Sequence, residues 1–138
     1  MGVVLDTSVL IAAERRTVRF EALLHALGDE PVAMAAITAA ELLHGCHRAA
    51  DAGVRARRGA FVEGLLDVVP VLPFGLVEAR RHAELWAELA RSGRPIGAYD
   101  MVVGATALAR GYALATLNHR EFSRIGGLTL VPTGEFRA

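Results

Sequence analysis

The chain has 138 residues, of which 53% are hydrophobic and 22% are charged, a composition typical of one globular domain with a buried core. Its 15 basic and 15 acidic residues give a formal net charge of zero, and all 15 basic residues are arginine. The absence of lysine excludes P-loop nucleotide binding, protein kinase chemistry and Schiff-base chemistry, because each of these requires a lysine side chain.

The cysteine content and the N-terminus bear on where the protein resides. Cys46 is the single cysteine, so it can form neither an internal disulfide nor a thiolate metal site. The apolar run at residues 3–5 follows no basic stretch and ends at an acid, unlike a signal peptide or a membrane span. We therefore expect a cytoplasmic protein that does not enter a membrane.

Short apolar runs alternate with helical patterns along the whole chain. In chain order, the pattern predicts a strand at 3–5, a helix at 19–27, a strand at 32–35, helices at 38–50 and 54–66, a strand at 68–72, helices at 76–92 and 98–110, and strands at 112–117 and 128–131. Glycines at 28, 93 and 111 end three of these helices. Strands alternating with helices, with continuous apolar strand segments, indicate an α/β fold with a parallel sheet covered on both faces.

Polar side chains follow several of the predicted strands. Asp6 closes the first strand, Glu41 lies one turn into the helix after the second, and Asn118 follows the strand at 112–117. Asp100 lies in the first turn of a helix that is otherwise almost wholly apolar. Because ligands of open parallel sheets bind beyond the carboxyl ends of the strands, we expect these side chains to gather at one edge.

Helix capping is the alternative explanation for each of these side chains taken singly. Glu41 fits a capping box with Thr38, and Asn118 begins a similar pattern with Glu121. Asp100 fits this explanation least, because a carboxylate on so apolar a helix is costly to bury unless it is paired or bound to a cation.

Taken together, the carboxylates Asp6, Glu41 and Asp100 indicate a cation site. Carboxylates at one sheet edge repel each other, and a hard divalent cation with oxygen ligands removes that repulsion. Three acids without a histidine fit Mg²⁺ or Mn²⁺ better than zinc. Such an ion activates water and shields the charge that grows on a phosphate, which is the chemistry of phosphodiester hydrolysis.

At this point the sequence resembles the PIN-domain family, and within it the VapC-type ribonuclease toxins. The resemblance rests on four segments, in the family's order, that span nearly the whole chain. They are Val-Leu-Asp-Thr-Ser-Val-Leu-Ile at 4–11, Thr-Ala-Ala-Glu-Leu-Leu-His-Gly at 38–45, Pro-Ile-Gly-Ala-Tyr-Asp at 95–100, and Thr-Leu-Asn at 116–118 followed by Glu-Phe at 121–122.

The resemblance assigns roles to individual positions. It implies a metal-binding role for three acids, which are Asp6, Glu41 and Asp100. It matches three hydroxyl side chains to positions that orient the acids or bound water, and these are Thr7, Ser8 and Thr116. The fourth catalytic position, often a further Asp in PIN nucleases, is Asn118 here. Because an amide brings no charge, this difference leaves the number of metal ions open.

The family implies a three-layer α/β/α PIN-like fold with a central parallel sheet of four to five strands, and residues 1–138 would form a single PIN domain. It implies a Mg²⁺- or Mn²⁺-dependent endoribonuclease that acts as the toxin of a toxin–antitoxin pair and cleaves tRNA, rRNA or mRNA. It further implies a VapB-type antitoxin that covers the acidic pocket, and assembly as a homodimer or a toxin–antitoxin hetero-oligomer. The apolar stretches at 20–27 and 61–66 are candidate surfaces for these partners.

Two other functions remain open from the sequence. One is a PIN-fold module that binds RNA or protein without cleavage, which the neutral Asn118 favours and the three retained acids oppose. The other is an RNA-processing or DNA-repair nuclease that is not a toxin. A metal pair of His44 and His47, a site role for His119, and Asp6 as a phosphoryl-transfer nucleophile are weaker candidates.

The arginines lie in several clusters, most of them typical of solvated helix faces. Arg94 precedes the Asp100 segment closely, so we expect it to contact an RNA phosphate. Such contacts give affinity and salt dependence rather than sequence choice. Few exposed aromatic side chains are predicted, so recognition is expected to depend on RNA shape.

Overall fold

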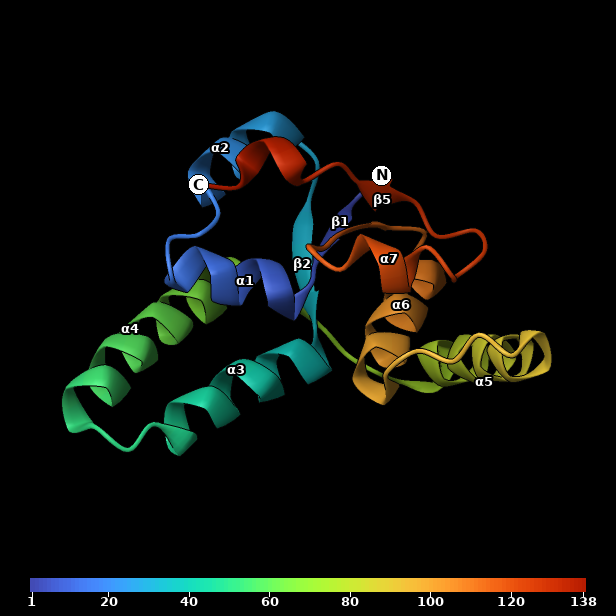
Figure 1. Ribbon diagram of the computed structural model, residues 1–138, viewed down its shortest axis with the longest axis horizontal. Coiled ribbons are helices and arrows are strands. Elements are labelled where there is room, and N and C mark those ends of the chain that lie inside the picture. The colour runs from blue at the N-terminus through green and yellow to red at the C-terminus, as the bar shows by residue number, and fades with distance from the viewer.

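Five parallel strands form the centre of the computed structural model, which describes residues 1–138 (Figure 1). The sheet has the order β3-β2-β1-β4-β5, and all neighbouring strands run parallel. The strands are β1 (Val3–Leu5), β2 (Val32–Ala35), β3 (Val71–Leu72), β4 (Ala113–Ala115) and β5 (Leu130–Val131). The chain builds outward from β1 to one edge and then crosses to β4, so the strand order reverses between β1 and β4.

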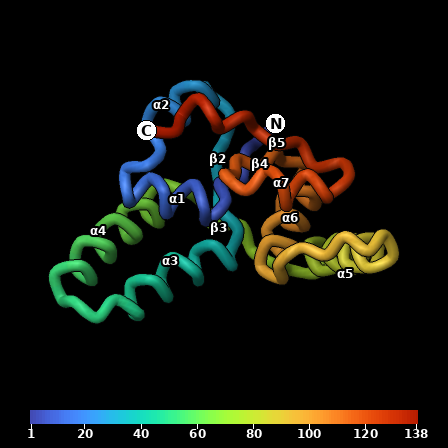
Figure 2. Tube along the Cα trace, in the orientation of Figure 1, coloured from blue at the N-terminus to red at the C-terminus, as the bar shows by residue number.

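Seven α-helices and one short 3₁₀ helix surround this sheet. They are α1 (Thr7–Glu14), α2 (Phe20–Leu27), α3 (Ala36–Arg48), α4 (Ala52–Val68), α5 (Leu76–Ser92), α6 (Ala98–Arg110), α7 (His119–Phe122) and the 3₁₀ helix Gly134–Phe136. The α3–α4 pair extends from one side of the molecule as a helical hairpin, and α5 lies on the other side (Figure 2). No helix is both long enough and apolar enough to cross a membrane.

The alternation of side chains along β1 separates two apolar cores. Val4 points into a core with Leu114 and with residues of α5, α6 and α7. Val3 and Leu5 point to the opposite face, into a core built with α1, α3 and α4. Both faces of the sheet are therefore covered, as continuous apolar strands require. The predicted three-layer α/β/α fold with a parallel sheet is confirmed.

Two elements differ from the sequence prediction. The sequence does not predict helix α1, because residues 9–13 form an apolar run without helical periodicity, and none of its residues is exposed. The strand expected at 68–72 is only Val71–Leu72, since α4 continues to Val68. Pro70 indicates an edge position, and β3 does lie at the edge of the sheet.

The helix ends agree with the predicted glycine stops. Gly93 and Gly111 follow α5 and α6 with φ angles of 65° and 68°, in the left-handed region that side chains other than glycine rarely adopt. The end of α6 is also joined to the start of α5, because Arg110 Nε lies 3.2 Å from the buried carboxylate of Glu78. Together these features fix where α6 begins and ends, and so fix the position of Asp100 in its first turn.

Candidate acidic site at the carboxyl edge of the sheet

Asp6 is the buried centre of the site. It follows β1 directly and is only 4% exposed. Its Oδ2 atom accepts hydrogen bonds from Ser8 Oγ at 2.6 Å and from Thr116 Oγ1 at 2.8 Å. Backbone amides after β4 hold both hydroxyls in turn, since Leu117 N–H donates to Ser8 and Asn118 N–H donates to Thr116. These hydrogen bonds orient the carboxylate and occupy Oδ2, which leaves Oδ1 for a ligand.

Glu41 reaches the site from α3. Its Oε1 atom accepts a hydrogen bond of 2.7 Å from Thr7 Oγ1 at the start of α1, and the Thr7 hydroxyl also lies 2.9 Å from that of Thr38. The predicted capping box of Thr38 and Glu41 is therefore wrong. The helix begins at Ala36, with Ala35 at its N-cap, so Thr38 lies inside the helix and Glu41 turns toward α1.

The negative charges of the other carboxylates act on Asp100. It is half-buried in the first turn of α6. Burial, followed by the negative charges of Asp6, Glu121 and Glu41, raises the pKa of Asp100 from 3.8 to about 6. Each of these causes disfavours the ionised form. Four carboxylates from four segments of the chain thus act on one another at this edge of the sheet.

Glu121 belongs to the site although the sequence did not single it out as a site residue. Its Oε1 atom accepts a hydrogen bond of 2.6 Å from Gly97 N–H, and its Oε2 atom accepts one of 3.0 Å from the Asn118 side-chain amide. These two hydrogen bonds are the main reasons why the pKa of Glu121 is lowered. A methyl group on Gly97 would lie 3.4 Å from Asp100 Oδ2 and 3.6 Å from Glu121 Oε1, so the two carboxylates flank Gly97 closely.

The same contacts correct the interpretation of the segment 118–121 as a capping box. Asn118 is the N-cap of α7, but its side chain caps no backbone amide. It donates to Glu121 instead. The position of Glu121, three residues after a polar side chain that ends a strand, was the sequence signal for this carboxylate.

The donor set fits a hard divalent cation. Oxygen atoms of carboxylates and an amide are the ligands that Mg²⁺ and Mn²⁺ prefer, and burial together with three neighbouring carboxylates raises the pKa of Asp100. The side chains do not, however, converge into a ready-made set of three or more ligands. This arrangement suits an ion that keeps several of its waters and contacts only one or two carboxylates.

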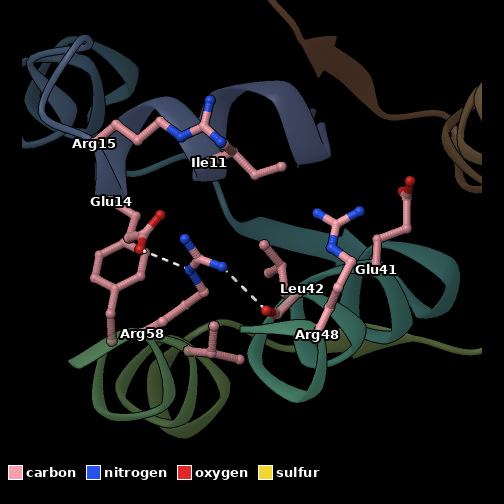
Figure 3. Close-up of a pocket in the computed structure, with 10 residues that line it drawn as sticks. Ile11, Glu14, Arg15, Glu41, Leu42, Arg48 and Arg58 are labelled. Carbon is pink, nitrogen blue, oxygen red and sulfur yellow. Dashed lines mark hydrogen bonds and ion pairs between the residues drawn. The ribbon is translucent and has the colours of Figure 1, made fainter. Parts of the chain in front are cut away.

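Glu41 also borders a cleft between α1, α3 and α4 (Figure 3). Arg58 crosses this cleft, where its Nε lies 3.2 Å from Glu14 Oε1 and its Nη1 donates to the Gly45 carbonyl. Arg15 and Arg48 line the same cleft. The cleft is small, about 60 Å³, and none of the other three carboxylates lines it.

The weaker histidine candidates lie outside the carboxylate cluster. His119 Nε2 lies 3.1 Å from the hydroxyl of Thr133, which donates to the Thr116 carbonyl. The imidazole of His119 therefore supports the backbone behind Thr116. His44 and His47 are both exposed on α3, and neither belongs to a group of side chains able to hold a metal.

The expectation of few exposed aromatic side chains is wrong for Trp86 and Tyr99, which are 61% and 57% exposed. Both line an apolar hollow of about 420 Å³ between α5 and α6. Trp86 is exposed because Leu85 and Leu89 form the buried side of α5. The side chains that follow them on the helix therefore face outward.

The apolar stretches expected to meet a partner, 20–27 and 61–66, are only partly packed into the protein. Leu23 of α2, and Val62 and Leu65 of α4, are buried because these helices cover other parts of the fold. The exposed large apolar side chains of the folded part lie elsewhere: Val68, Val71, Phe74, Leu76, Val77, Trp86 and Tyr99. They lie at the end of α4, in β3 and the segment after it, along α5 and in the first turn of α6.

Comparison with known proteins agrees with this fold. A family model for the PIN domain matches residues 3–128. The chain is 36% identical over 131 residues to Ribonuclease VapC1 of Rickettsia felis, covering 95% of this chain and 96% of that protein. It is 33% identical over 102 residues to the tRNA(fMet)-specific endonuclease VapC of Shigella flexneri, covering 74% and 75%.

A solved structure shares the architecture. It is a member of the VapBC family of toxin–antitoxin systems, VapBC-5 from Mycobacterium tuberculosis, with a TM-score of 0.75 and 33% identity over 95% of this chain and 97% of that one. The parallel sheet and the helices around it are thus those of a PIN domain. The chain belongs to the PIN-domain family and, within it, to the VapC ribonucleases, which confirms the resemblance seen in the sequence.

Proposed function

We propose that this chain is a Mg²⁺- or Mn²⁺-dependent endoribonuclease, the toxin of a toxin–antitoxin pair, with residues 1–138 forming a single PIN domain. The main support is the carboxylate Asp100, whose pKa is raised to about 6 by its burial and by the negative charges of Asp6, Glu121 and Glu41. Repulsion of this kind costs folding free energy unless a cation offsets it. A site that is unfavourable when empty is a natural site for a divalent ion.

The proposed roles follow from the contacts of each side chain. Asp6 and Asp100 would hold the ion, with Glu41 and Asn118 acting directly or through metal-bound water. Ser8 and Thr116 fix the Asp6 carboxylate, and Thr7 fixes Glu41. When bound, the ion supplies a water of lowered pKa and offsets charge on the phosphate.

The proposed substrate is cellular RNA in the cytoplasm. A relative of this chain is named a tRNA(fMet)-specific endonuclease, which makes tRNA the first substrate to test. The proposed protein partner is a VapB-type antitoxin, because a similar structure is of a toxin–antitoxin complex. Inhibition of translation and growth would follow from RNA cleavage by toxin that is free of its antitoxin.

Cleavage of total RNA by the purified protein with Mg²⁺ tests this proposal. We expect the wild type and an Asp29→Asn control to cleave, because Asp29 is an exposed acid outside the site. Asp6→Asn and Asp100→Asn should each lose at least about a hundredfold in rate, as expected when a group that holds an essential metal is removed. Equal cleavage by wild type and both site variants would contradict the proposal.

A PIN-fold binding module without cleavage is the second candidate. Two observations favour it: Asn118 brings no charge, and the carboxylates do not form a ready-made metal-ligand cluster. Growth arrest on expression that persists in Asp6→Asn and Asp100→Asn would support this candidate. RNA cleavage without growth arrest, and without an antitoxin-like reading frame beside the gene, would instead indicate an RNA-processing nuclease.

A further inference from the structure

A second hollow lies beside the acidic site, and its charge is opposite. It is an open depression of about 570 Å³ without a hydrophobic residue in its lining. Its lining residues are Gly93, Arg94, Pro95, Arg120, Ser123 and Arg124. Three guanidinium groups therefore share one depression on a protein whose net charge is zero. They come from two segments of the chain, the α5–α6 connection and α7 with the two residues that follow it.

Two of these arginines are free to take a ligand. Arg94 and Arg120 are exposed, and neither side chain forms an ion pair with an acid of the chain. Arg124 is held in place, because its Nη1 atom donates a 2.7 Å hydrogen bond to the Pro95 carbonyl. Arg124 thus ties the two segments together, while Arg94 and Arg120 present their guanidinium groups to solvent.

The hollow adjoins the carboxylates through two connections. Glu121 follows Arg120 in α7, and its Oε1 accepts the Gly97 amide at 2.6 Å. Gly97 is three residues after Arg94, a distance of about 10 Å at most along an extended chain. Nucleotides that are stacked as in a duplex rise by about 3.4 Å each along one strand, so this distance spans about three stacked nucleotides.

We infer that the Arg94–Arg120–Arg124 hollow binds a backbone phosphate of the RNA strand, within about three nucleotides of the phosphate that lies at the carboxylates. This inference rests on the proposed ribonuclease function and extends it to how the strand is held. Guanidinium groups bind phosphate oxygens through paired, charge-assisted hydrogen bonds. Because the carboxylates repel RNA, a neighbouring positive hollow supplies binding energy that the acidic site cannot provide.

The cleft of Arg15 and Arg48 is the competing route for the strand. It is smaller, about 60 Å³, and four of its ten lining residues are hydrophobic. Its third arginine, Arg58, is already paired with Glu14. The hollow at Arg94 offers more open space and no apolar lining, which is why a phosphate favours it.

The test measures binding of a short fluorescent single-stranded RNA by anisotropy in EDTA, which prevents metal-dependent cleavage. We expect the double variant Arg94→Ala/Arg120→Ala to raise Kd about tenfold and to reduce the slope of log K against log salt by about 0.7, the value for one lost phosphate contact. With Mg²⁺, KM for RNA should rise while kcat changes little. Arg94→Lys/Arg120→Lys should retain most of the salt slope.

The matched control is Arg57→Ala/Arg80→Ala, which removes the same charge from exposed positions on α4 and α5. A control that loses as much affinity as the hollow variant would overturn the inference, since the effect would then be one of net charge. If only Arg15→Ala/Arg48→Ala reduces the slope of log K against log salt, the inference is overturned, and the RNA strand lies along the cleft instead. If the wild type cleaves no RNA, the proposed function fails, whereas binding in EDTA still decides the role of the hollow.

Discussion

The side-chain amide of Asn118 donates a hydrogen bond of 3.0 Å to Glu121 Oε2. This contact gives the neutral residue at the end of β4 a physical role. An amide at position 118 neutralises no charge, but it holds one carboxylate of the site in place and helps to lower the pKa of Glu121. A carboxylate at the same position would do the opposite as long as no cation is bound.

Asn118→Asp should therefore destabilise the metal-free protein and increase its response to metal. Placing a second carboxylate against Glu121 should lower the free energy of unfolding in EDTA by about 1 kcal/mol, because a favourable hydrogen bond becomes a repulsion. Thermal unfolding with and without Mg²⁺ measures both effects. Asn118→Ala removes the hydrogen bond without adding charge, so it should lose stability in EDTA but gain nothing extra from Mg²⁺. Identical behaviour of the Asp and Ala variants would contradict this explanation.

Asp100 should make the metal-free protein less stable as the pH rises. Its folded pKa of about 6 lies above its ordinary value of 3.8, so the folded protein binds the proton more tightly than the unfolded chain does. The stabilising contribution is complete below the unfolded pKa and is lost as the pH rises through about 6. Asp100→Asn should accordingly raise the free energy of unfolding by about 1 kcal/mol near neutral pH in EDTA, a value reduced for solvent screening at this half-exposed group.

Chemical denaturation across the acidic and neutral range measures this effect. At low pH, where Asp100 is protonated in both states, the wild type and Asp100→Asn should have similar free energies of unfolding. Asp29→Asn, at an exposed acid outside the site, should follow the wild type throughout. The explanation is contradicted if the difference in free energy of unfolding between the wild type and Asp100→Asn does not change with pH. The ionised Asp100 would then not destabilise the folded protein.

Divalent metal should stabilise the protein through the same carboxylates. At a Mg²⁺ concentration of about ten times Kd, the free energy of unfolding should rise by about 1.4 kcal/mol. Below the pKa of Asp100 the ion must displace a proton, so metal affinity should fall with acidification. Melting curves over a Mg²⁺ titration measure the shift, which should be small or absent in Asp6→Asn. The same rise in both proteins would mean that the ion binds elsewhere.

Thr116 should contribute to both stability and activity, although it cannot perform chemistry itself. Its buried hydroxyl donates to the carboxylate of Asp6 and accepts a hydrogen bond from the backbone N–H of Asn118. Thr116→Val keeps the shape and removes both hydrogen bonds, so we expect a loss of about 2 kcal/mol in the free energy of unfolding and a lower kcat. The control is Thr106→Val, an equally buried threonine whose hydroxyl bonds only to the Val102 carbonyl of its own helix. That variant should leave the rate of RNA cleavage unchanged.

The sequence predicts the sheet and the edge at which Asp6 and Asn118 lie, because these depend on apolar periodicity and on the end of each strand. It does not predict the hydrogen bond of Thr7 to Glu41, which joins residues 34 positions apart. In the local sequence, an acid that caps its own helix cannot be told from an acid that contacts a residue far away in the chain. Both lie in the first turns of a helix. Only the packing of α1 against α3 decides between them, and α1 itself lacked the periodicity that identifies a helix.

The hollow beside the acidic site has a property that follows from its composition. Its charges are guanidinium groups, which remain protonated at any pH at which the protein is folded and carry no amine for acylation. The pKa of Asp100, which lies next to this hollow, is raised to about 6, so this carboxylate loses negative charge as the pH falls toward that value. The positive half of this surface is therefore constant and the negative half is adjustable, so acidification alone shifts the local balance toward attraction of a polyanion.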